Sequence, residues 1–265
     1  MSEQEVPLSE RKQAFGAWAE QYDRYRPHYP QGLVSRLLEE AGHSTTSPAT
    51  VVDLGAGTGL LTRTLVDLGA RVIAVEPDER MANRLAEVVP GAQVLVGSAE
   101  QTGLDTASVD AVIGAQMWHW VDEAQAIPEV ARILVPGGVF VPLWVLRDDR
   151  TDWVAEHVRL LRIEDAYRVI SQLDQPVQGP CFDDCELLEF EFGQELDEDG
   201  LVGLVGTYSS IRLRGDLLEC ERLTRELVAT HPALAGSQRI TMPYVARAFL
   251  TRRNDHDGDC RPAAV

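Results

Sequence analysis

Long apolar segments are absent from this 265-residue sequence. No run of 18 or more apolar residues occurs, whereas a membrane-spanning helix needs about 20. The first residues, MSEQEVPLSERKQ, are polar and lack the apolar core of a secretory signal. We therefore expect no membrane partner and a cytoplasmic location.

Basic residues are scarce compared with acidic ones. The sequence contains 24 Lys and Arg against 42 Asp and Glu, which gives a formal net charge of −18. Nucleic-acid binding depends mainly on contacts between basic side chains and phosphates, so a field of this sign disfavours DNA, RNA and anionic membrane surfaces. A small-molecule partner remains. The sequence does not reveal the oligomeric state, and we expect a monomer or a homodimer.

Cysteine is also rare, with four residues: Cys181, Cys185, Cys220 and Cys260. The nearest pair is spaced C-x₃-C, no second pair matches it, and no histidine stands at a zinc-finger interval. We predict plain structural or surface thiols and no metal site. Free thiols are typical of cytoplasmic proteins.

Apolar strands alternate with helical patterns in the central part of the chain. This alternation predicts an α/β fold, with a mostly parallel sheet and helices on both of its faces. The expected strands are Thr50–Gly57, Arg71–Asp78, 92–100, 108–116 and Gly138–Val145, and the expected helices are Leu60–Gly69, Glu79–Val89 and Asp122–Val135.

The flanking segments have weaker patterns. On the N-terminal side we expect helices at about 9–25 and 31–41, separated by Pro27 and Pro30. Beyond residue 150 we expect helices at 153–173, 201–208 and 216–230, and strands at 187–196 and 240–252. No linker divides the chain, so we predict one domain: a helical N-terminal part (1–45), a core (46–150), a further set of helices and strands (151–253) and a tail (254–265).

A glycine-rich turn follows the first expected strand, in the pattern Asp53-x-Gly55-x-Gly57-x-Gly59. Glycines there permit positive φ and let a ligand lie against the backbone, at the sheet edge where open α/β sheets bind ligands. The dinucleotide fingerprint G-x-G-x-x-G would need its third glycine at position 60, which is Leu60. The carboxylate of Asp53 disfavours a pyrophosphate and suits a cationic amino acid. S-adenosylmethionine (SAM) is such a ligand, with a sulfonium, an amino group and no phosphate.

A second carboxylate, Glu76, closes the next expected strand. In that position it can accept hydrogen bonds from both hydroxyls of a ribose. NAD and SAM both carry a ribose, so Glu76 alone does not discriminate between them.

Five motifs occur in order along the chain: VVDLGAGTG, VIAVEPD, GSAE, VDAVIGAQ and VPGG. This series, over about 15–144, resembles class I SAM-dependent methyltransferases, especially the small-molecule group that includes ubiquinone/menaquinone-biosynthesis methyltransferases (methyltransferase type 11). The segment YDRYRPHYP (22–30) resembles the N-terminal lid of that group. The resemblance implies a Rossmann-like seven-stranded sheet with an antiparallel last strand, a helical lid, and a methyl transfer from SAM that releases S-adenosylhomocysteine.

The resemblance also assigns the cofactor-binding residues. The glycine loop would wrap the methionine part of SAM, Asp53 would lie near its amino group, and Glu76 would hold the ribose. Ser98 stands where many relatives have Asp, so the contact to the adenine amino group is left open among Ser98, the Ala99 amide and Glu100. The full cofactor set is Asp53, Gly55, Ala56, Gly57, Gly59, Glu76, Pro77, Met81, Ser98, Ala99, Glu100, Gln116, Tyr22 and Arg26, with Arg26 suited to the SAM carboxylate.

The acceptor is expected to face the segment after the fourth strand of the core. His119 is the one histidine near the expected methyl position, and it is the candidate general base, with a structural hydrogen-bonding role as the alternative. Trp118 and Trp120 either bind the acceptor or cap the core. Trp18 and Tyr22 are candidates for lid packing, and Trp18 completes the predicted substrate set of Trp18, Trp118, His119 and Trp120.

Three other functions stay open. A same-fold enzyme of the cyclase or pericyclase type would bind SAM without transferring its methyl group. A non-catalytic SAM-binding subunit would bind SAM without turnover. An NAD-dependent oxidoreductase is disfavoured by the glycine spacing.

Overall fold

The computed structural model describes residues 19–164, 173, 175–177 and 179–254. The first part of the expected N-terminal helix, including the predicted substrate residue Trp18, lies outside the described residues. So do most of positions 165–173, which we expected to be helical.

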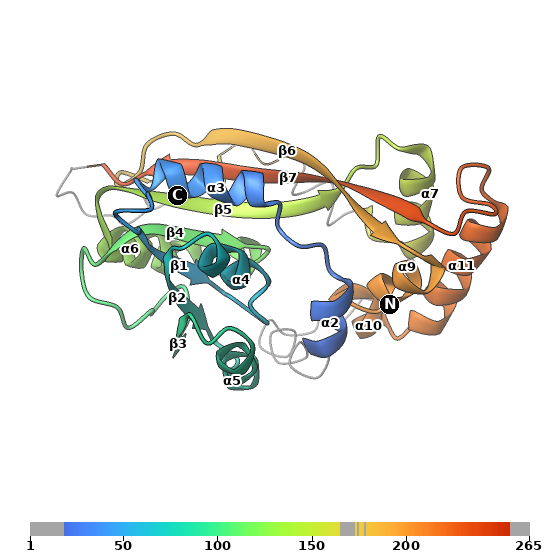
Figure 1. Cartoon of the computed structure of the whole chain (residues 1–265), viewed down its shortest axis with the longest axis horizontal. Helices are drawn as coiled ribbons and strands as arrows, with labels where there is room; N and C mark the ends of the chain where they lie inside the picture. The colour runs from blue at the N-terminus through green and yellow to red at the C-terminus, as the bar shows by residue number, and fades with distance from the viewer. Residues whose placement is uncertain (1–18, 165–172, 174, 178, 255–265) are drawn as a thin grey trace. The chain divides into compact units, whose positions relative to one another are not determined.

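A seven-stranded sheet organises the chain (Figure 1). Its strand order is β3-β2-β1-β4-β5-β7-β6. The pairs β1–β2, β1–β4, β2–β3 and β4–β5 are parallel, and the last strand pair is antiparallel, so the predicted fold class is confirmed. The strands are β1 (Thr50–Leu54), β2 (Arg71–Glu76), β3 (Gln93–Val96), β4 (Val109–Ala115), β5 (Leu134–Arg147), β6 (Glu186–Leu196) and β7 (Ile240–Arg252).

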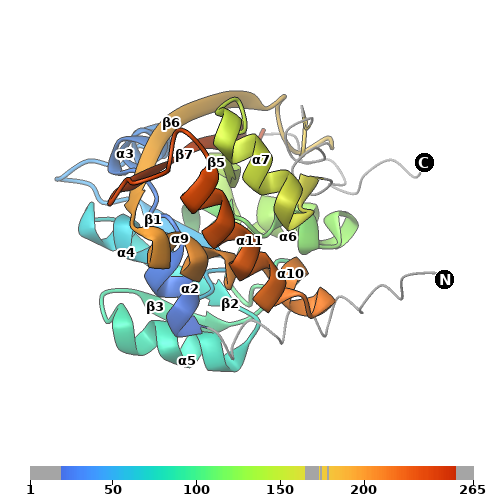
Figure 2. The same cartoon turned by 90° about the vertical axis from the view of Figure 1, so that its right-hand side faces the viewer.

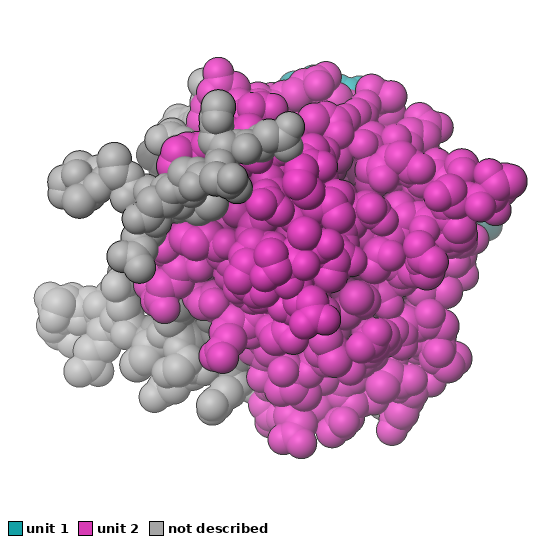
Figure 3. Space-filling view, turned by 90° about the vertical axis from the view of Figure 1, so that its left-hand side faces the viewer, with its two compact units in different colours: residues 1–27, 145–172, 191–246 teal, residues 28–144, 173–190, 247–265 magenta. Residues whose placement is uncertain are grey.

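The described chain divides into two compact units. Unit 1 comprises residues 1–27, 145–172 and 191–246, and unit 2 comprises residues 28–144, 173–190 and 247–265. The divisions fall within the long strands β5, β6 and β7. Figure 3 shows one face of unit 2.

In its described part, unit 2 contains the central strands and the α-helices α3 (Gln31–Glu40), α4 (Leu60–Asp67), α5 (Glu79–Val88) and α6 (Glu123–Ile133). Strand β1 is almost wholly buried, as expected for a parallel strand covered on both faces. Helix α5 begins where the Asp78 carboxylate accepts the N–H groups of Arg80 (2.9 Å) and Met81 (3.4 Å), which satisfies donors that a helix start leaves unpaired. Its apolar face, with Met81, Ala82 and Leu85, is buried.

Unit 1 contains α2 (Ala19–Tyr25), α7 (Asp152–Leu161), α9 (Glu198–Val205), α10 (Ser209–Arg214) and α11 (Leu217–Thr230). Helix α11 packs on α7, α9 and α10, and α2 packs on α9 (Figure 2). The contact between α2 and α9 depends on Gly203, because a Cβ at that position would lie 2.5 Å from Cζ of the Tyr25 ring.

The elements expected on the N-terminal side of residue 150 are close to those found, whereas several beyond it differ. Helix α7 ends at Leu161, because Arg162 has a left-handed backbone with φ of 54°. Helix α9 begins three residues earlier than expected, where the Asp197 carboxylate accepts the Gly200 N–H at 2.7 Å. The short helix α10 was not predicted. Strand β5 is longer than expected and reaches Arg147.

The expectation that the cysteines are plain thiols is wrong for Cys181. Cys181 is disulfide-bonded, whereas Cys185 and Cys220 are not. Sequence spacing does not tell which cysteines a fold brings within bonding distance. Among the described residues, no helix combines the length and apolar character needed to cross a membrane.

Candidate cofactor and active site

The glycine loop connects β1 to α4 in unit 2. Gly55, Gly57 and Gly59 all have positive φ, at 67°, 58° and 88°, a region that other L-residues enter at a cost. The N–H groups of Gly55 and Ala56 donate to the Val75 carbonyl, at 2.8 and 3.2 Å. The loop is therefore held against the end of β2, as the sequence pattern predicted.

The three glycines differ in what surrounds them. A Cβ at Gly55 would lie 2.9 Å from Cγ of Met117, and one at Gly59 would lie 3.1 Å from Cγ of Leu85. A Cβ at Gly57 would meet no atom within 4 Å. Gly55 and Gly59 thus permit close packing within the protein. Gly57 leaves the backbone open on one side, which fits a ligand lying against it.

Glu76, the last residue of β2, holds the loop by its carboxylate. Oε2 accepts the Gly57 N–H at 2.8 Å and Oε1 accepts the Asp78 N–H at 2.9 Å. The residue is only 5% exposed. A carboxylate has about four acceptor sites, and these two bonds fix both of its oxygens beside the loop. This position fits the predicted role of Glu76.

Asp53 places a second carboxylate on the neighbouring strand β1. It is 1% exposed, and Oδ2 accepts a hydrogen bond from the Thr62 hydroxyl at 2.5 Å. Burial raises the pKa of Asp53 to about 7, and the nearby charge of Glu76 acts in the same direction. An approaching cation would favour the ionised form. Two acidic groups from adjacent strands therefore suit a ligand that carries positive charge.

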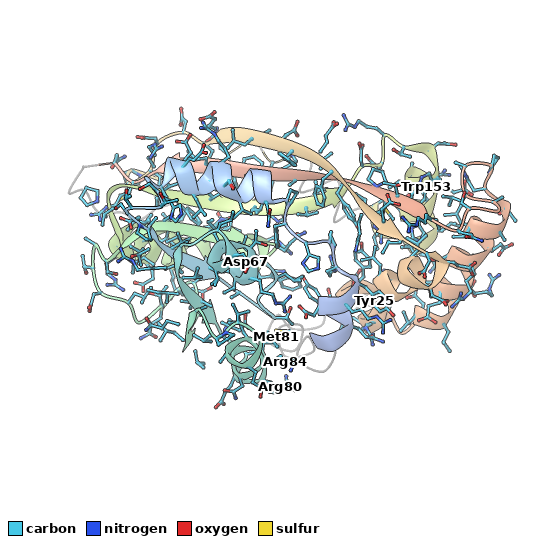
Figure 4. The ribbon with its side chains drawn as sticks, viewed as in Figure 1. Tyr25, Asp67, Arg80, Met81, Arg84 and Trp153 are labelled. Carbon is cyan, nitrogen blue, oxygen red and sulfur yellow. The ribbon has the colours of Figure 1, made fainter. Side chains whose placement is uncertain are left out.

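The residues expected at the adenine lie on α5 and in the loop after β3. Met81 is buried in the first turn of α5, Pro77 is exposed before it, and Arg80 lies on the solvent side (Figure 4). Ala99 is buried, and Ser98 is half-buried. Glu100 accepts the Asp122 N–H at 3.0 Å, which places its carboxylate at the start of α6. Contact of these residues with an adenine stays a prediction.

Gln116 follows β4 with a left-handed backbone, at φ of 58°. This conformation costs a non-glycine residue on the order of 1 kcal/mol, and such positions cluster at functional sites. The Gln116 N–H donates to the Leu143 carbonyl at 2.7 Å. The end of β4 is therefore held by β5 at the position expected for the methionine arm.

Trp118 and Trp120 lie in a short 3₁₀ helix (Trp118–Trp120) and differ in exposure. Trp118 is 1% exposed, its indole N–H donates to the Pro176 carbonyl at 3.1 Å, and its ring meets Phe140 edge to face. These contacts favour the core-packing interpretation of Trp118. Trp120 is half-buried beside the His119 ring, with 5.0 Å between ring centroids, so contact with an acceptor stays a prediction for this residue.

His119 has a defined tautomer. The indole N–H of Trp144 lies 3.2 Å from its Nδ1. Because an indole nitrogen only donates, Nδ1 accepts and the proton of the neutral ring lies on Nε2. His119 is exposed as a residue, but the protein around the ring desolvates the charged form and lowers its pKa to about 4. At neutral pH it therefore presents a donor N–H.

The predicted lid residues Tyr22 and Arg26 belong to unit 1. There, Nη2 of Arg26 donates to the Thr207 carbonyl at 3.2 Å, and its guanidinium lies 5.0 Å from the Tyr22 ring centroid. Contact of these two residues with a SAM carboxylate stays a prediction.

Two supporting residues were missed by sequence reasoning. Thr62 binds Asp53 from the first turn of α4, and Trp144 sets the tautomer of His119 from β5. The chain offers no motif for either residue, since each acts through a contact between two different elements of the fold.

Known proteins resemble this chain over most of its length. Residues 52–141 match a family described as "Methyltransferase domain". An uncharacterized methyltransferase of Mycobacterium tuberculosis is 40% identical over 235 residues, which cover 88% of this chain and 92% of the relative.

Solved structures show the same fold. A candidate type II methyltransferase from Anaeromyxobacter dehalogenans is 26% identical, with a TM-score of 0.63 over 87% of this chain and 97% of that one. A 4+2 cyclase shares the fold at 13% identity, with a TM-score of 0.53 over 94% of this chain and 97% of the cyclase. The motif series, the order of the strands and the 40% identity over 88% of the chain all agree. The chain therefore belongs to the class I SAM-dependent methyltransferases.

Proposed function

We propose that this protein transfers a methyl group from SAM to a small-molecule acceptor. The observation that carries the proposal is the pair of buried carboxylates, Asp53 and Glu76, beside a glycine loop whose backbone is open at Gly57. A ligand with positive charge, a ribose and no phosphate suits these groups. The strongly acidic chain also favours a small molecule over a nucleic acid as the acceptor.

Different residues of unit 2 would bind different parts of the cofactor. The loop backbone would hold the methionine part, Asp53 the amino group and Glu76 the ribose hydroxyls. Gln116 would lie beside the methionine arm. The adenine would lie against the set formed by Pro77, Met81, Ser98, Ala99 and Glu100. When bound, SAM supplies a methyl group on a positively charged sulfur, which is already a good leaving group.

The protein therefore contributes mainly alignment, because an in-line displacement depends on the orientation of donor and acceptor. The strained backbone of Gln116 and the bonds of the glycine loop provide fixed positions for this purpose.

We assign His119 the role of orienting the acceptor through its Nε2–H. Its action as a general base would require a lone pair on Nε2, and hence loss of the bond from Trp144. The low pKa of His119 also makes its imidazole a weak base at neutral pH.

Calorimetric titration of the purified protein with SAM, S-adenosylhomocysteine and NADH tests the cofactor class. We expect micromolar binding of the first two and no binding of NADH. Binding of NADH without SAM would overturn every cofactor assignment above.

An acceptor screen read by mass tests the reaction. Methylation adds the mass of a methylene group to the acceptor and releases S-adenosylhomocysteine. A cyclase would convert its substrate without this gain and without consuming SAM. Binding of SAM without turnover of any acceptor would indicate a non-catalytic subunit.

A further inference from the structure

A buried arginine lies at the end of β5, in unit 1. Arg147 is only 2% exposed. Within the described part of the chain no carboxylate forms an ion pair with it, and its Nε and Nη2 have no hydrogen-bond partner. A buried charge is costly unless it is paired. Neighbouring Asp148 does not compensate, because it binds Arg150 instead, with Oδ2 2.6 Å from Nη2.

The remaining nitrogen of Arg147 is held by a hydrogen-bond chain. Nη1 lies 3.4 Å from Nδ1 of His157, and Nε2 of that ring lies 2.9 Å from the Thr224 hydroxyl, which donates to the Cys220 carbonyl at 2.8 Å. Arginine only donates, so Nδ1 of His157 accepts and its Nε2–H donates to Thr224. Burial and the charge of Arg147 lower the pKa of His157, which keeps the ring neutral. This series of hydrogen bonds fixes the guanidinium at Nη1.

The two nitrogens left over form a specific edge. In arginine, Nε–H and the outer Nη2–H point in the same direction, which is the fork that binds the two oxygens of a carboxylate or phosphate side by side. The hydrogen bonds through His157 do not use this edge of the guanidinium.

The surroundings of the edge are positively charged and aromatic. The guanidinium of Arg147 lies 4.5 Å from the centroid of the Tyr208 ring, and that of Arg26 lies 4.4 Å from the same centroid. The two guanidinium groups create a positive field around the ring, which favours an anion beside Arg147. Tyr208 and Arg26 are half-buried, so they reach the surface, whereas the Nε and Nη2 atoms of Arg147 lie beneath it.

We propose that Arg147, beside the ring of Tyr208, forms an oxyanion site for a carboxylate or phosphate group of a small molecule. The site itself follows from unit 1 alone. It does not depend on the proposed methyltransferase function.

Thermal denaturation of the full chain with added anions tests the site without SAM. Sodium succinate and inorganic phosphate serve as probes at constant ionic strength, and neutral succinamide serves as the matched control. We expect succinate or phosphate to raise the melting temperature in a saturable way and succinamide to leave it unchanged. Which of the two anions saturates at the lower concentration distinguishes a carboxylate site from a phosphate site. No saturable effect of either anion would overturn the proposal.

Variants link the effect to the edge of Arg147. R147M should weaken anion binding by roughly tenfold or more, whereas R147K, which keeps the charge without the fork, should bind more weakly than the wild type and more tightly than R147M. R150M is the matched control, since Arg150 is exposed and paired with Asp148 and Glu191, and it should bind like the wild type. If R147M does not fold, anion binding is compared between R147K and R150M instead. Equal anion binding in R147K and the wild type would contradict recognition by the fork.

Titration of the same variants with S-adenosylhomocysteine separates this proposal from the proposed function. Unchanged affinity in R147M and R147K is expected. A loss of affinity there would mean that Arg147 belongs to the cofactor site, which overturns the proposal of a separate anion site. Failure of the wild type to bind S-adenosylhomocysteine would instead contradict the methyltransferase proposal and leave the anion result standing.

Discussion

The two compact units bury charges of opposite sign. In unit 2, Asp53 and Glu76 place two carboxylates beside the open glycine loop. In unit 1, Arg147 is buried beside the ring of Tyr208. Each arrangement costs stability in the absence of a ligand, because buried charges lose their hydration. The sign of each buried charge is the basis of the two proposals above, a ligand with a cationic group for unit 2 and an anion for unit 1.

The largest effect on SAM affinity is expected from Glu76→Ala, which removes one of the two buried carboxylates of unit 2. Loss of the ribose contacts and of the bond to Gly57 should weaken SAM binding by about 100-fold, which is roughly 3 kcal/mol. Calorimetric titration measures it. Glu79→Ala is the matched control, because Glu79 is an exposed acid in the first turn of α5. Unchanged affinity in Glu76→Ala would remove this residue from the site.

A smaller effect, of about tenfold in SAM affinity, is expected from Asp53→Asn, together with a gain in stability. The pKa of Asp53 is about 7 when folded, against an ordinary value of 3.8. Between these values the folded state binds more protons than the unfolded state, so the free energy of unfolding falls as pH rises and the full cost is present above pH 7. At pH 8 the ligand-free variant should gain roughly 1–3 kcal/mol, since one pKa unit equals about 1.4 kcal/mol.

The same titration gives the wild type a pH dependence. SAM affinity should rise several-fold from pH 6 to pH 8 as Asp53 ionises, and this rise should be absent in Asp53→Asn. Calorimetry at several pH values, with chemical denaturation of both proteins, measures the two effects. Parallel pH profiles for the two proteins would contradict the assignment of Asp53 to the cationic part of the cofactor.

Two glycines allow a matched test of whether a ligand lies against the glycine loop. Gly57 and Gly69 both have positive φ, and a Cβ at either would meet no atom within 4 Å. Replacement by Ala should therefore cost each protein about 1 kcal/mol of stability through backbone strain. Only Gly57→Ala should also weaken SAM binding. Equal SAM affinity in the two variants would place the ligand elsewhere.

The smallest effect is expected at His119. Replacement of Trp144 by Phe removes the donor to Nδ1 and should lower turnover a few-fold, less than His119→Ala, with SAM affinity unchanged in both. Because the pKa of His119 is about 4, the pH–rate profile should show no inflection near 6.5 that His119→Ala removes. Such an inflection would restore the general-base interpretation.

Much of unit 2 could be predicted because its signals are local. The glycine loop, the strand that ends at Glu76 and the alternation of strands and helices each depend on neighbouring residues, whose backbone preferences and periodicity act over a few positions. The elements of unit 1 were predicted less well. Helix α9 begins at a cap on Asp197 and α7 ends at a left-handed Arg162, and neither feature changes the apolar pattern.

The sequence by itself determined the family, the parallel core of the sheet and the acidic pair of Asp53 and Glu76, because these features follow from contiguous motifs. Only the tertiary structure decided that Trp144 selects the tautomer of His119 and that the His157 chain leaves one edge of Arg147 unused. Hydrogen bonds and desolvation depend on which side chains meet in space. No local sequence pattern indicates such contacts between residues that are distant in sequence.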